Sequence, residues 1–246
     1  MLNVLFASYL LFASGCSVIG TNNHIVNEDE EAKQMLQGIW INDEEGVPAL
    51  MAKGDSLFFP DTTSLPATFW IYKDTFYIQG YNICRYKITK QAKHLFKFVN
   101  QTGDEIKLVR SDDKGMVKEF YQYRPYALNI FRTIDRDTIG EGKGLNYTCK
   151  IHIEPTSDRI IKSTYNNEGI EVDNMYLDNE ARLKVTLGSE EIYSHSFRKQ
   201  EFSAYVPEDF MSKSIIRDIL YSHADTSAVF FDAIIGIPDA SSCYVV

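Results

Sequence analysis

Carboxylates at two places in the sequence are candidates for acid–base chemistry. Asp135 and Asp137 alternate along a predicted strand, so both side chains face the same side of it. Glycoside hydrolysis uses two carboxyl groups roughly 5 to 10 Å apart across a cleft, a spacing that an alternating pair meets by geometry alone. Asp232 interrupts the apolar run 229–237, where a buried carboxylate needs a partner. These residues suggest a hydrolase. The alternative for Asp135 and Asp137 is a charged edge that blocks strand pairing. The alternative for Asp232 is a side chain that faces solvent or is hydrogen-bonded to the backbone.

The histidines form no recognisable catalytic or metal-binding motif. His152 and Glu154 are expected on one strand face, where they either share a proton or a metal or are ordinary exposed polar residues. His223 and Asp225 are expected at the end of a helix, where the helix dipole favours a cation. The sequence lacks the nucleophile-elbow, phosphate-loop, zinc-protease and dinucleotide motifs. We therefore expect no metal, no cofactor and a non-enzymatic function, with the hydrolase as the alternative.

The apolar amino terminus indicates export. Residues 1–27 carry no charged side chain, and the apolar run within them is too short to span a bilayer but suits a secretory signal. The run ends in Ala13-Ser14-Gly15-Cys16, which resembles the lipobox of bacterial lipoproteins. The resemblance implies a signal peptide over 1–15 and a lipidated Cys16 that anchors the chain to a membrane. A buried amphipathic helix is the alternative.

The segment after the predicted lipidation site is polar. Ser17 follows Cys16, and in Gram-negative lipoproteins this residue type is associated with the outer membrane. The lipobox resemblance thus implies a cell-envelope protein, facing either the periplasm or the cell surface. We interpret 16–35 as the lipidated cysteine and a tether. Its acidic run 28–31 is either part of a solvated linker or a helix N-terminus.

Three cysteines remain after Cys16, so they form at most one disulfide. Cys149 and Cys243 fall in the same predicted domain and are the most suitable pair with Cys84 left over. A buried free cysteine in a strand is the alternative for each of them. No Cys-x-x-Cys spacing occurs, which gives no support to a zinc site.

The elements of the first half are short strands, typical of an antiparallel meander. Residues 69–72 and 76–79 alternate around the turn Lys73-Asp74, and further strands recur at short intervals up to residue 110. Regular spacing of this kind predicts a sheet that closes as a small barrel over 36–125, filled by side chains, with a last strand near 117–123. Gly38-Ile39-Trp40 resembles the Gly-x-Trp start of lipocalin-like barrels; a core Trp on a first strand is the alternative.

Aromatic side chains concentrate on one hairpin of this meander. Trp70, Tyr72 and Tyr77 are candidates for stacking on sugar rings or for a protein-binding patch. The alternative is that they fill the core and rim of the barrel.

The second half, 134–246, is predicted as a β-sandwich-like domain crossed by one helix. Pro207 suits a helix start, and Met211, Ile215 and Ile219 are four residues apart, which predicts a helix over 207–222. Three stretches carry a resemblance to a known family: Ile134-Asp135-Arg136-Asp137-Thr138, Tyr147-Thr148-Cys149-Lys150-Ile151 and the strand-helix-strand pattern over 191–237. In these stretches this half resembles the C-terminal domain of uncharacterised lipoproteins from Gram-negative gut bacteria. That family has no established activity, so the resemblance assigns no site residues.

Composition agrees with a folded, exported protein. The 246 residues are 44% hydrophobic with a formal net charge of −9, which excludes whole-chain disorder and is unsuited to nucleic acid. We expect a mainly β (β-rich α+β) envelope lipoprotein, with a barrel-like meander followed by a sandwich-like domain, that binds a protein, a glycan or a small apolar ligand. A hydrolase and a scaffold component of an envelope complex are the alternatives.

Overall fold

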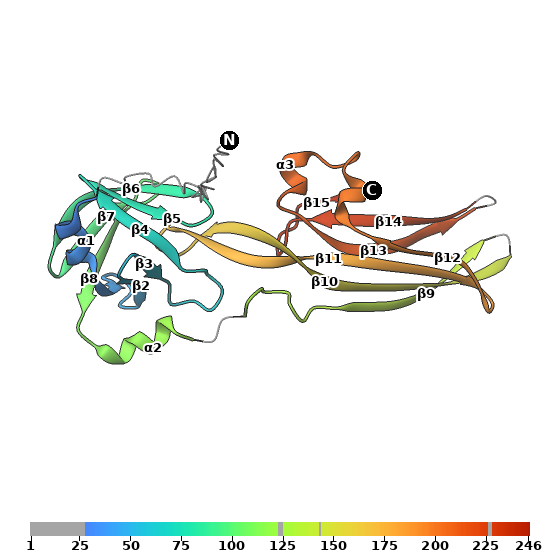
Figure 1. Cartoon of the computed structure of the whole chain (residues 1–246), viewed down its shortest axis with the longest axis horizontal. Helices are drawn as coiled ribbons and strands as arrows, with labels where there is room; N and C mark the ends of the chain where they lie inside the picture. Colours follow the sequence, from blue (N-terminus) through green and yellow to red (C-terminus); the bar gives the residue numbers. More distant parts are fainter. Residues whose placement is uncertain (1–27, 123–124, 143, 226–227) are drawn as a thin grey trace, which may run out of the picture.

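The computed structural model describes residues 28–122, 125–142, 144–225 and 228–246. The predicted signal peptide 1–15 and Cys16 lie outside the described residues. The described chain is mainly β, as predicted, and forms a barrel followed by a two-sheet domain (Figure 1). The first part comprises α1 (Glu30–Leu36), β1 (Gly38–Asn42), β2 (Pro48–Lys53), β3 (Ser56–Phe58), β4 (Ala67–Tyr72), β5 (Thr75–Gln79), β6 (Ile83–Ala92), β7 (Leu95–Val99) and β8 (Glu105–Ser111).

The meander closes into an antiparallel barrel because β1 pairs with β8 as well as with β2. The inward positions of the alternating strands carry large rings, which fill the interior as expected for a small barrel. Trp40 on β1 is fully buried, and its Nε1 donates to the Leu36 carbonyl over 2.7 Å. Phe76 meets Phe96 edge-on with ring centroids 5.4 Å apart. The barrel predicted from the period-two pattern is therefore confirmed as a packed core.

Residues 30–35 are not a tether. Asp29 caps α1 by accepting a hydrogen bond from the Ala32 amide, and Glu30 and Glu31 occupy the first turn, where the helix dipole favours negative charge. Leu36 is fully buried in the barrel core and Ala32 is 7% exposed. The acidic run is therefore a helix N-terminus, the second of the two alternatives, and α1 belongs to the barrel.

The segment after β8 is helical rather than a last strand over 117–123. It forms η1 (Lys114–Met116), a 3-10 turn capped by Asp113, and then α2 (Val117–Phe120). Phe120 is 1% exposed and packs against Ile39 and Met51 on the outside of β1 and β2. A ninth strand has no free edge to join because β1 and β8 already pair with each other.

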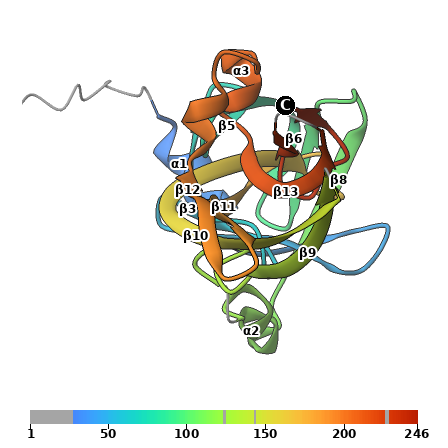
Figure 2. The ribbon, with the colours of Figure 1, turned by 90° about the vertical axis from the view of Figure 1, so that its right-hand side faces the viewer.

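The second domain contains a four-stranded and a three-stranded antiparallel sheet. The order of the first is β12-β11-β10-β9, and the order of the second is β13-β14-β15. Viewed along the long axis of the molecule, the larger sheet curves beneath β13 (Figure 2). The elements are β9 (Ile134–Gly142), β10 (Leu145–Tyr165), β11 (Glu171–Leu187), β12 (Glu190–Phe197), η2 (Lys199–Phe202), α3 (Glu208–Met211), β13 (Ile215–Ala224), β14 (Val229–Gly236) and β15 (Cys243–Val245).

The helix predicted over 207–222 is wrong beyond its first turn. Pro207 is followed by α3, which ends at Met211, and the rest of the predicted helix is strand β13. A bulge at Arg217 shifts the register between Ile216 and Asp218. Ile216 and Ile219 consequently face the same core although they are three residues apart, a spacing that imitates a helix. β-branched side chains favour the extended conformation that β13 adopts.

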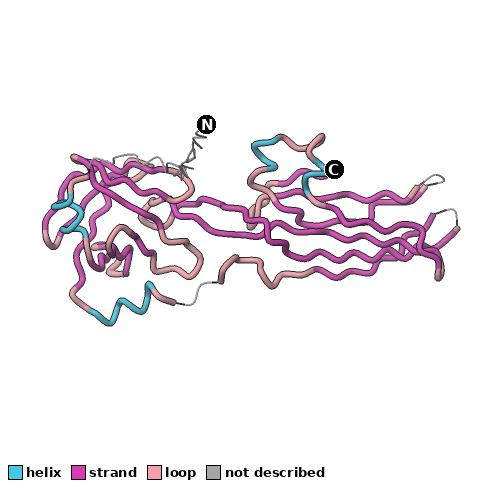
Figure 3. Tube along the Cα trace, in the orientation of Figure 1, coloured by secondary structure: helices cyan, strands magenta, loops and turns pink. Residues whose placement is uncertain are grey.

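The hairpin of β10 and β11 joins the two domains. Both strands run from the sandwich to the barrel (Figures 1 and 3), where Ile170 and Val172 enter the barrel core with 0% and 6% exposure. Asp173 is buried beside them; its carboxylate accepts from the Tyr81 amide at 2.5 Å and from the Ser163 hydroxyl at 2.6 Å. The tip of the second domain thus closes one end of the barrel.

Candidate functional site

The aspartates of β9 lie on the exposed outer face of the four-stranded sheet, each beside a basic residue of β10. Asp135 Oδ1 is 2.6 Å from Nδ1 of His152, and Asp137 Oδ2 is 3.5 Å from Nζ of Lys150. The hydrogen bond with Asp135 raises the pKa of His152 above its ordinary value. These contacts are cross-strand pairs on a solvated surface, which neutralise a charged sheet edge.

The remaining predicted polar residues do not join them in a cleft. His152 Nε2 lies 3.4 Å from Glu154, which also pairs with Arg182, so the predicted His152–Glu154 neighbours are part of a surface network. Asp232 is half-buried on β14 of the other sheet, opposite Leu220. Among the described residues, no group of three or more His, Cys, Asp and Glu side chains is placed to hold a metal ion.

His223 and Asp225 mark the end of a strand rather than of a helix, because β13 ends at Ala224. The His223 ring stacks on Phe230 of β14, with centroids 4.4 Å apart and an angle of 8° between the planes. The Asp225 carboxylate accepts from the Ala228 amide at 2.9 Å.

The three aromatic residues predicted to bind ligands lie on the outside of the barrel. Trp70 and Tyr77 are cross-strand partners that stack face to face, with centroids 5.0 Å apart and an interplanar angle of 6°. Arg85 of β6 lies over the Tyr77 ring, and Lys73 lies over Tyr72. Trp70, Tyr72 and Tyr77 are each half-buried. These aromatic and basic side chains form a ladder on the outer surface of β4 to β6. Much of the ring surface in this outer aromatic ladder is covered by the neighbouring rings and cations.

The cysteines of the described chain are free. Cys149 is buried on the inner face of β10, whereas Cys243 is exposed on β15, so the predicted disulfide is not formed in the structure. Burial raises the pKa of Cys149 above its ordinary value. Burial also raises the pKa of Cys84 to about 11. Both thiols are therefore protonated at neutral pH and are weak nucleophiles.

The two sheets of the second domain are held together along one edge. Arg136 of β9 makes a bidentate ion pair with Asp218 of β13, at 3.0 and 2.8 Å. Gly140 and Gly142 of β9 allow this approach, because a Cβ atom on them would collide with Tyr221 and Ala224 of β13. At the end nearest the barrel, further contacts between buried polar groups link the sheets, including Asn179 Nδ2 to the Ile216 carbonyl at 2.6 Å.

On the opposite side, between β12 and β14, the sheets enclose an apolar cleft of about 640 Å³. This volume is within the range of small-molecule sites. Ile192, Tyr193 and Phe230 are 46%, 44% and 39% exposed and mark the mouth. The described lining side chains carry no charge: Leu183, Val185, Ile192, Tyr193, Phe197, Phe202, Ile219, Ala228, Val229, Phe230, Phe231, Ala233 and Val246.

A second groove continues the apolar cleft past η2. It shares Phe197, Phe202 and Val246 with the cleft and adds Glu201, Tyr205 and Val245. The Glu201 carboxylate accepts from the Arg198 amide at 2.8 Å and lies 2.9 Å from His195, and these contacts lower the pKa of Glu201. The groove beside the apolar cleft is therefore lined by a carboxylate that is charged at neutral pH.

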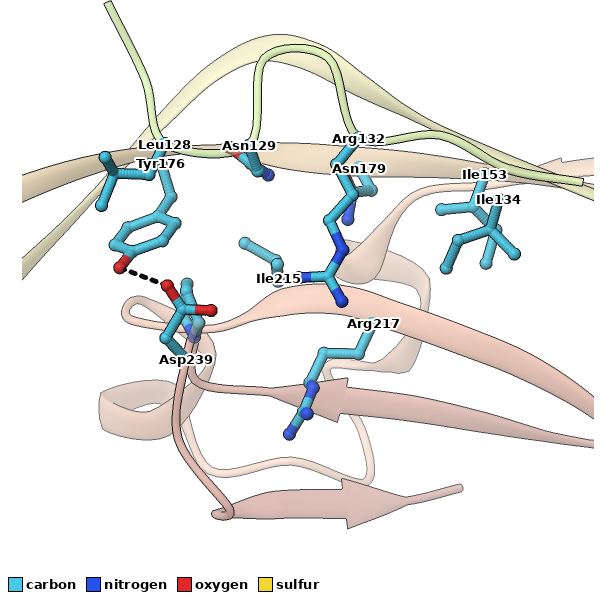
Figure 4. A pocket seen from close by; sticks show the side chains of 11 residues that line it. Leu128, Asn129, Arg132, Ile134, Ile153, Tyr176, Asn179, Ile215, Arg217 and Asp239 are labelled. Atoms are coloured by element: carbon cyan, nitrogen blue, oxygen red, sulfur yellow. Dashed lines mark hydrogen bonds between the residues drawn. The ribbon is translucent and has the colours of Figure 1, made fainter. Parts of the chain in front are cut away.

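A separate polar pocket of about 130 Å³ lies at the other end of the sheets, where the linker that precedes β9 crosses β11 and β13 (Figure 4). Arg132, Arg217 and Asp239 line it together with Tyr176 and Asn179. The Tyr176 hydroxyl donates to Asp239 Oδ2 over 2.8 Å.

Comparison with known proteins identifies the second domain. Residues 112–246, more than half of the chain, match the family described as a domain of unknown function, DUF4738. The chain belongs to the DUF4738 family. No match was found among curated proteins. The DUF4738 region begins directly after β8 and includes α2, both sheets, the apolar cleft and the polar pocket. Within the described ranges, no helix has the length and apolar character that crossing a membrane requires.

The cleft of the DUF4738 domain involves residues that the sequence interpretation did not single out. Phe230 and Phe231 are adjacent in a strand, so their side chains point to opposite faces and one of them must lie away from the core. Phe197 and Phe202 flank the short connection between β12 and η2. The two adjacent phenylalanines indicate from sequence that one large ring lies outside the core. The cleft itself arises because the two sheets separate along one edge, and this separation depends on contacts between distant parts of the chain.

Proposed function

We propose that this chain is an envelope lipoprotein, anchored through Cys16, whose DUF4738 domain binds a single alkyl chain of an amphiphile. The observation that carries the proposal is the cleft of about 640 Å³ between the sheets, whose described lining side chains are apolar apart from the Tyr193 hydroxyl. A glycan needs hydrogen-bonding groups at its site, whereas an alkyl chain needs none. Burial of each methylene group contributes about 0.8 kcal/mol.

Charge favours an amphiphile with a neutral or zwitterionic head group. Glu201 lines the groove that continues the cleft, and the chain as a whole carries a formal net charge of −9. Both disfavour an anionic head group through like-charge repulsion. An alkyl chain lying in the cleft would place its head group toward the groove, beside Glu201 and His195.

A binding assay with a neutral apolar dye, N-phenyl-1-naphthylamine, tests the cleft. The full chain carrying Cys16→Ser is used, so that no acyl group of its own competes. We expect saturable fluorescence enhancement that lysophosphatidylcholine reverses. Ile192→Asp, which places a charge at the mouth, should weaken dye binding at least tenfold.

Ile139→Asp is the matched control. Ile139 is also an exposed isoleucine on an edge strand of the same sheet, at 73% exposure, but it lies on β9, away from the cleft. Unchanged binding by Ile139→Asp is expected. Equal loss in both variants, or no saturable binding by the parent chain, would reject the proposal. A dimer by analytical ultracentrifugation that dissociates in Ile192→Asp would instead identify a second copy as the occupant.

The anchor is tested independently. Cells expressing the chain are labelled with radioactive palmitate, and wild type should acquire label that Cys16→Ala abolishes. Absence of label on wild type, or equal label on the variant, would reject the lipoprotein part of the proposal and leave the cleft unaffected. The outer-membrane and glycan-binding expectations remain proposals of lower priority, because the outer aromatic ladder largely stacks on itself.

A further inference from the structure

The polar pocket beside the linker contains more cationic than anionic groups. Arg132 extends from the linker and Arg217 from β13 (Figure 4), and the only other formally charged residue of the described lining is Asp239. Arg132, Arg217 and Asp239 take part in none of the ion pairs found within the described residues. Among the described arginines of this domain, Arg136, Arg182 and Arg198 each pair with a carboxylate. With two cations and one anion, the pocket is suited to a monoanion.

An unsatisfied buried acceptor belongs to one of the residues that line the pocket. Asn179 is 8% exposed and lines the pocket, and its Nδ2 donates to the Ile216 carbonyl. Its Oδ1 is buried and accepts no hydrogen bond from the part of the chain that the structure describes. An acceptor in this state costs free energy, which a ligand with a donor group would recover.

The turn that carries Asp239 is held in a fixed, unusual shape. Asp239 has a φ of 45°, in the left-handed region that disfavours residues with a Cβ. Its carboxylate accepts from Tyr176, while Lys162 donates to the carbonyls of Pro238 and Asp239 at 2.7 and 3.0 Å. Arg217 donates to the Ala240 carbonyl at 2.8 Å. These contacts fix the position of the Asp239 carboxylate at the pocket.

The remaining walls are apolar and the pocket is small. Leu128, Ile134, Ile153 and Ile215 line it, and its volume of about 130 Å³ is that of about four waters in the liquid. Apolar walls favour an organic anion over inorganic phosphate. We propose that this pocket binds a small carboxylic acid with an amino or hydroxyl group on the adjacent carbon, its carboxylate on the Arg132 guanidinium and its donor group on Asn179.

Calorimetric titration of the full chain carrying Cys16→Ser tests the proposal, with alanine, lactate, acetate and inorganic phosphate as probes. We expect alanine or lactate to bind more tightly than acetate, because acetate lacks the donor, and the stronger of the two identifies the group that Asn179 accepts from. Phosphate is expected to bind more weakly than either. No binding of alanine and lactate at millimolar concentration, or phosphate as the tightest ligand, would overturn the proposal.

Variants locate the site. Arg132→Gln should weaken binding about tenfold or more, because hydrogen bonds to charged groups are strong, and Arg132 is exposed, so folding should be retained. Asn179→Ala should reduce the preference over acetate. Arg182→Gln, an exposed arginine on the outer face of the same sheet, is the control and should bind as the parent chain does. Equal loss in Arg132→Gln and Arg182→Gln would reject the assigned pocket.

Discussion

Replacing Ile170 by alanine should destabilise the barrel, although Ile170 belongs to the DUF4738 domain. Ile170 lies at the tip of the β10–β11 hairpin, is fully buried, and packs within the barrel core. Truncating a buried isoleucine to alanine costs about 2–5 kcal/mol, because apolar surface is lost and a cavity remains. For a chain of this size, that loss lowers Tm by about 4–20 °C.

Urea unfolding followed by tryptophan fluorescence measures this effect in the right place. The chain has two tryptophans, Trp40 on β1 and Trp70 on β4, so the signal reports on the barrel alone. Ile139→Ala is the control, since its side chain is 73% exposed and its replacement should change the unfolding free energy by less than about 0.5 kcal/mol. A fluorescence transition in Ile170→Ala that coincides with the parent's would refute the hairpin's role in the barrel core.

Three further predictions concern single residues of the DUF4738 domain. Gly140→Ala should lower Tm by thermal denaturation, because the added Cβ would displace the Tyr221 ring where β9 meets β13. Burial raises the pKa of Glu168, so the protein is most stable where Glu168 is neutral and loses stability as pH rises through that raised pKa. Glu168→Gln should therefore raise Tm at pH 8 and leave Tm unchanged near pH 4. An equal change in Tm at both pH values would contradict the raised pKa. Asp135→Asn should lower the pKa of His152 toward its ordinary value in an NMR titration, and an unchanged pKa would show that the pair is not formed in solution.

The barrel was predictable because its strands follow simple local rules. The alternation around Lys73-Asp74 gives both the strands and their turn, and pairing of Tyr72 with Thr75 confirms the turn. The inner face of β10, with Cys149, Ile151 and Ile153, also follows the period of two, and all three are at most 2% exposed. Where each strand pairs with its sequence neighbour, local pattern is enough to indicate the sheet.

The errors arose where the pattern departs from period two or depends on distant contacts. The helix prediction rested on the four-residue spacing of Met211, Ile215 and Ile219, but Ile215 faces a different cluster from the other two. The bulge at Arg217 instead brings Ile216 and Ile219 to the same core. The closure of β1 on β8 is what excludes a further strand near 117–123. The cleft was not predictable from sequence, because it depends on β9 packing against β13 while β12 stays apart from β14.

Paramagnetic broadening of methyl signals tests the proposed cleft most directly. Lysophosphatidylcholine with a doxyl label on its alkyl chain is added to methyl-labelled protein carrying Cys16→Ser. We predict strong broadening of Leu183, Val185 and Val246, which line the cleft, and little at Leu50 and Ile71 in the barrel core. Equal broadening in both domains, or broadening confined to the barrel, would contradict binding of the alkyl chain between the two sheets.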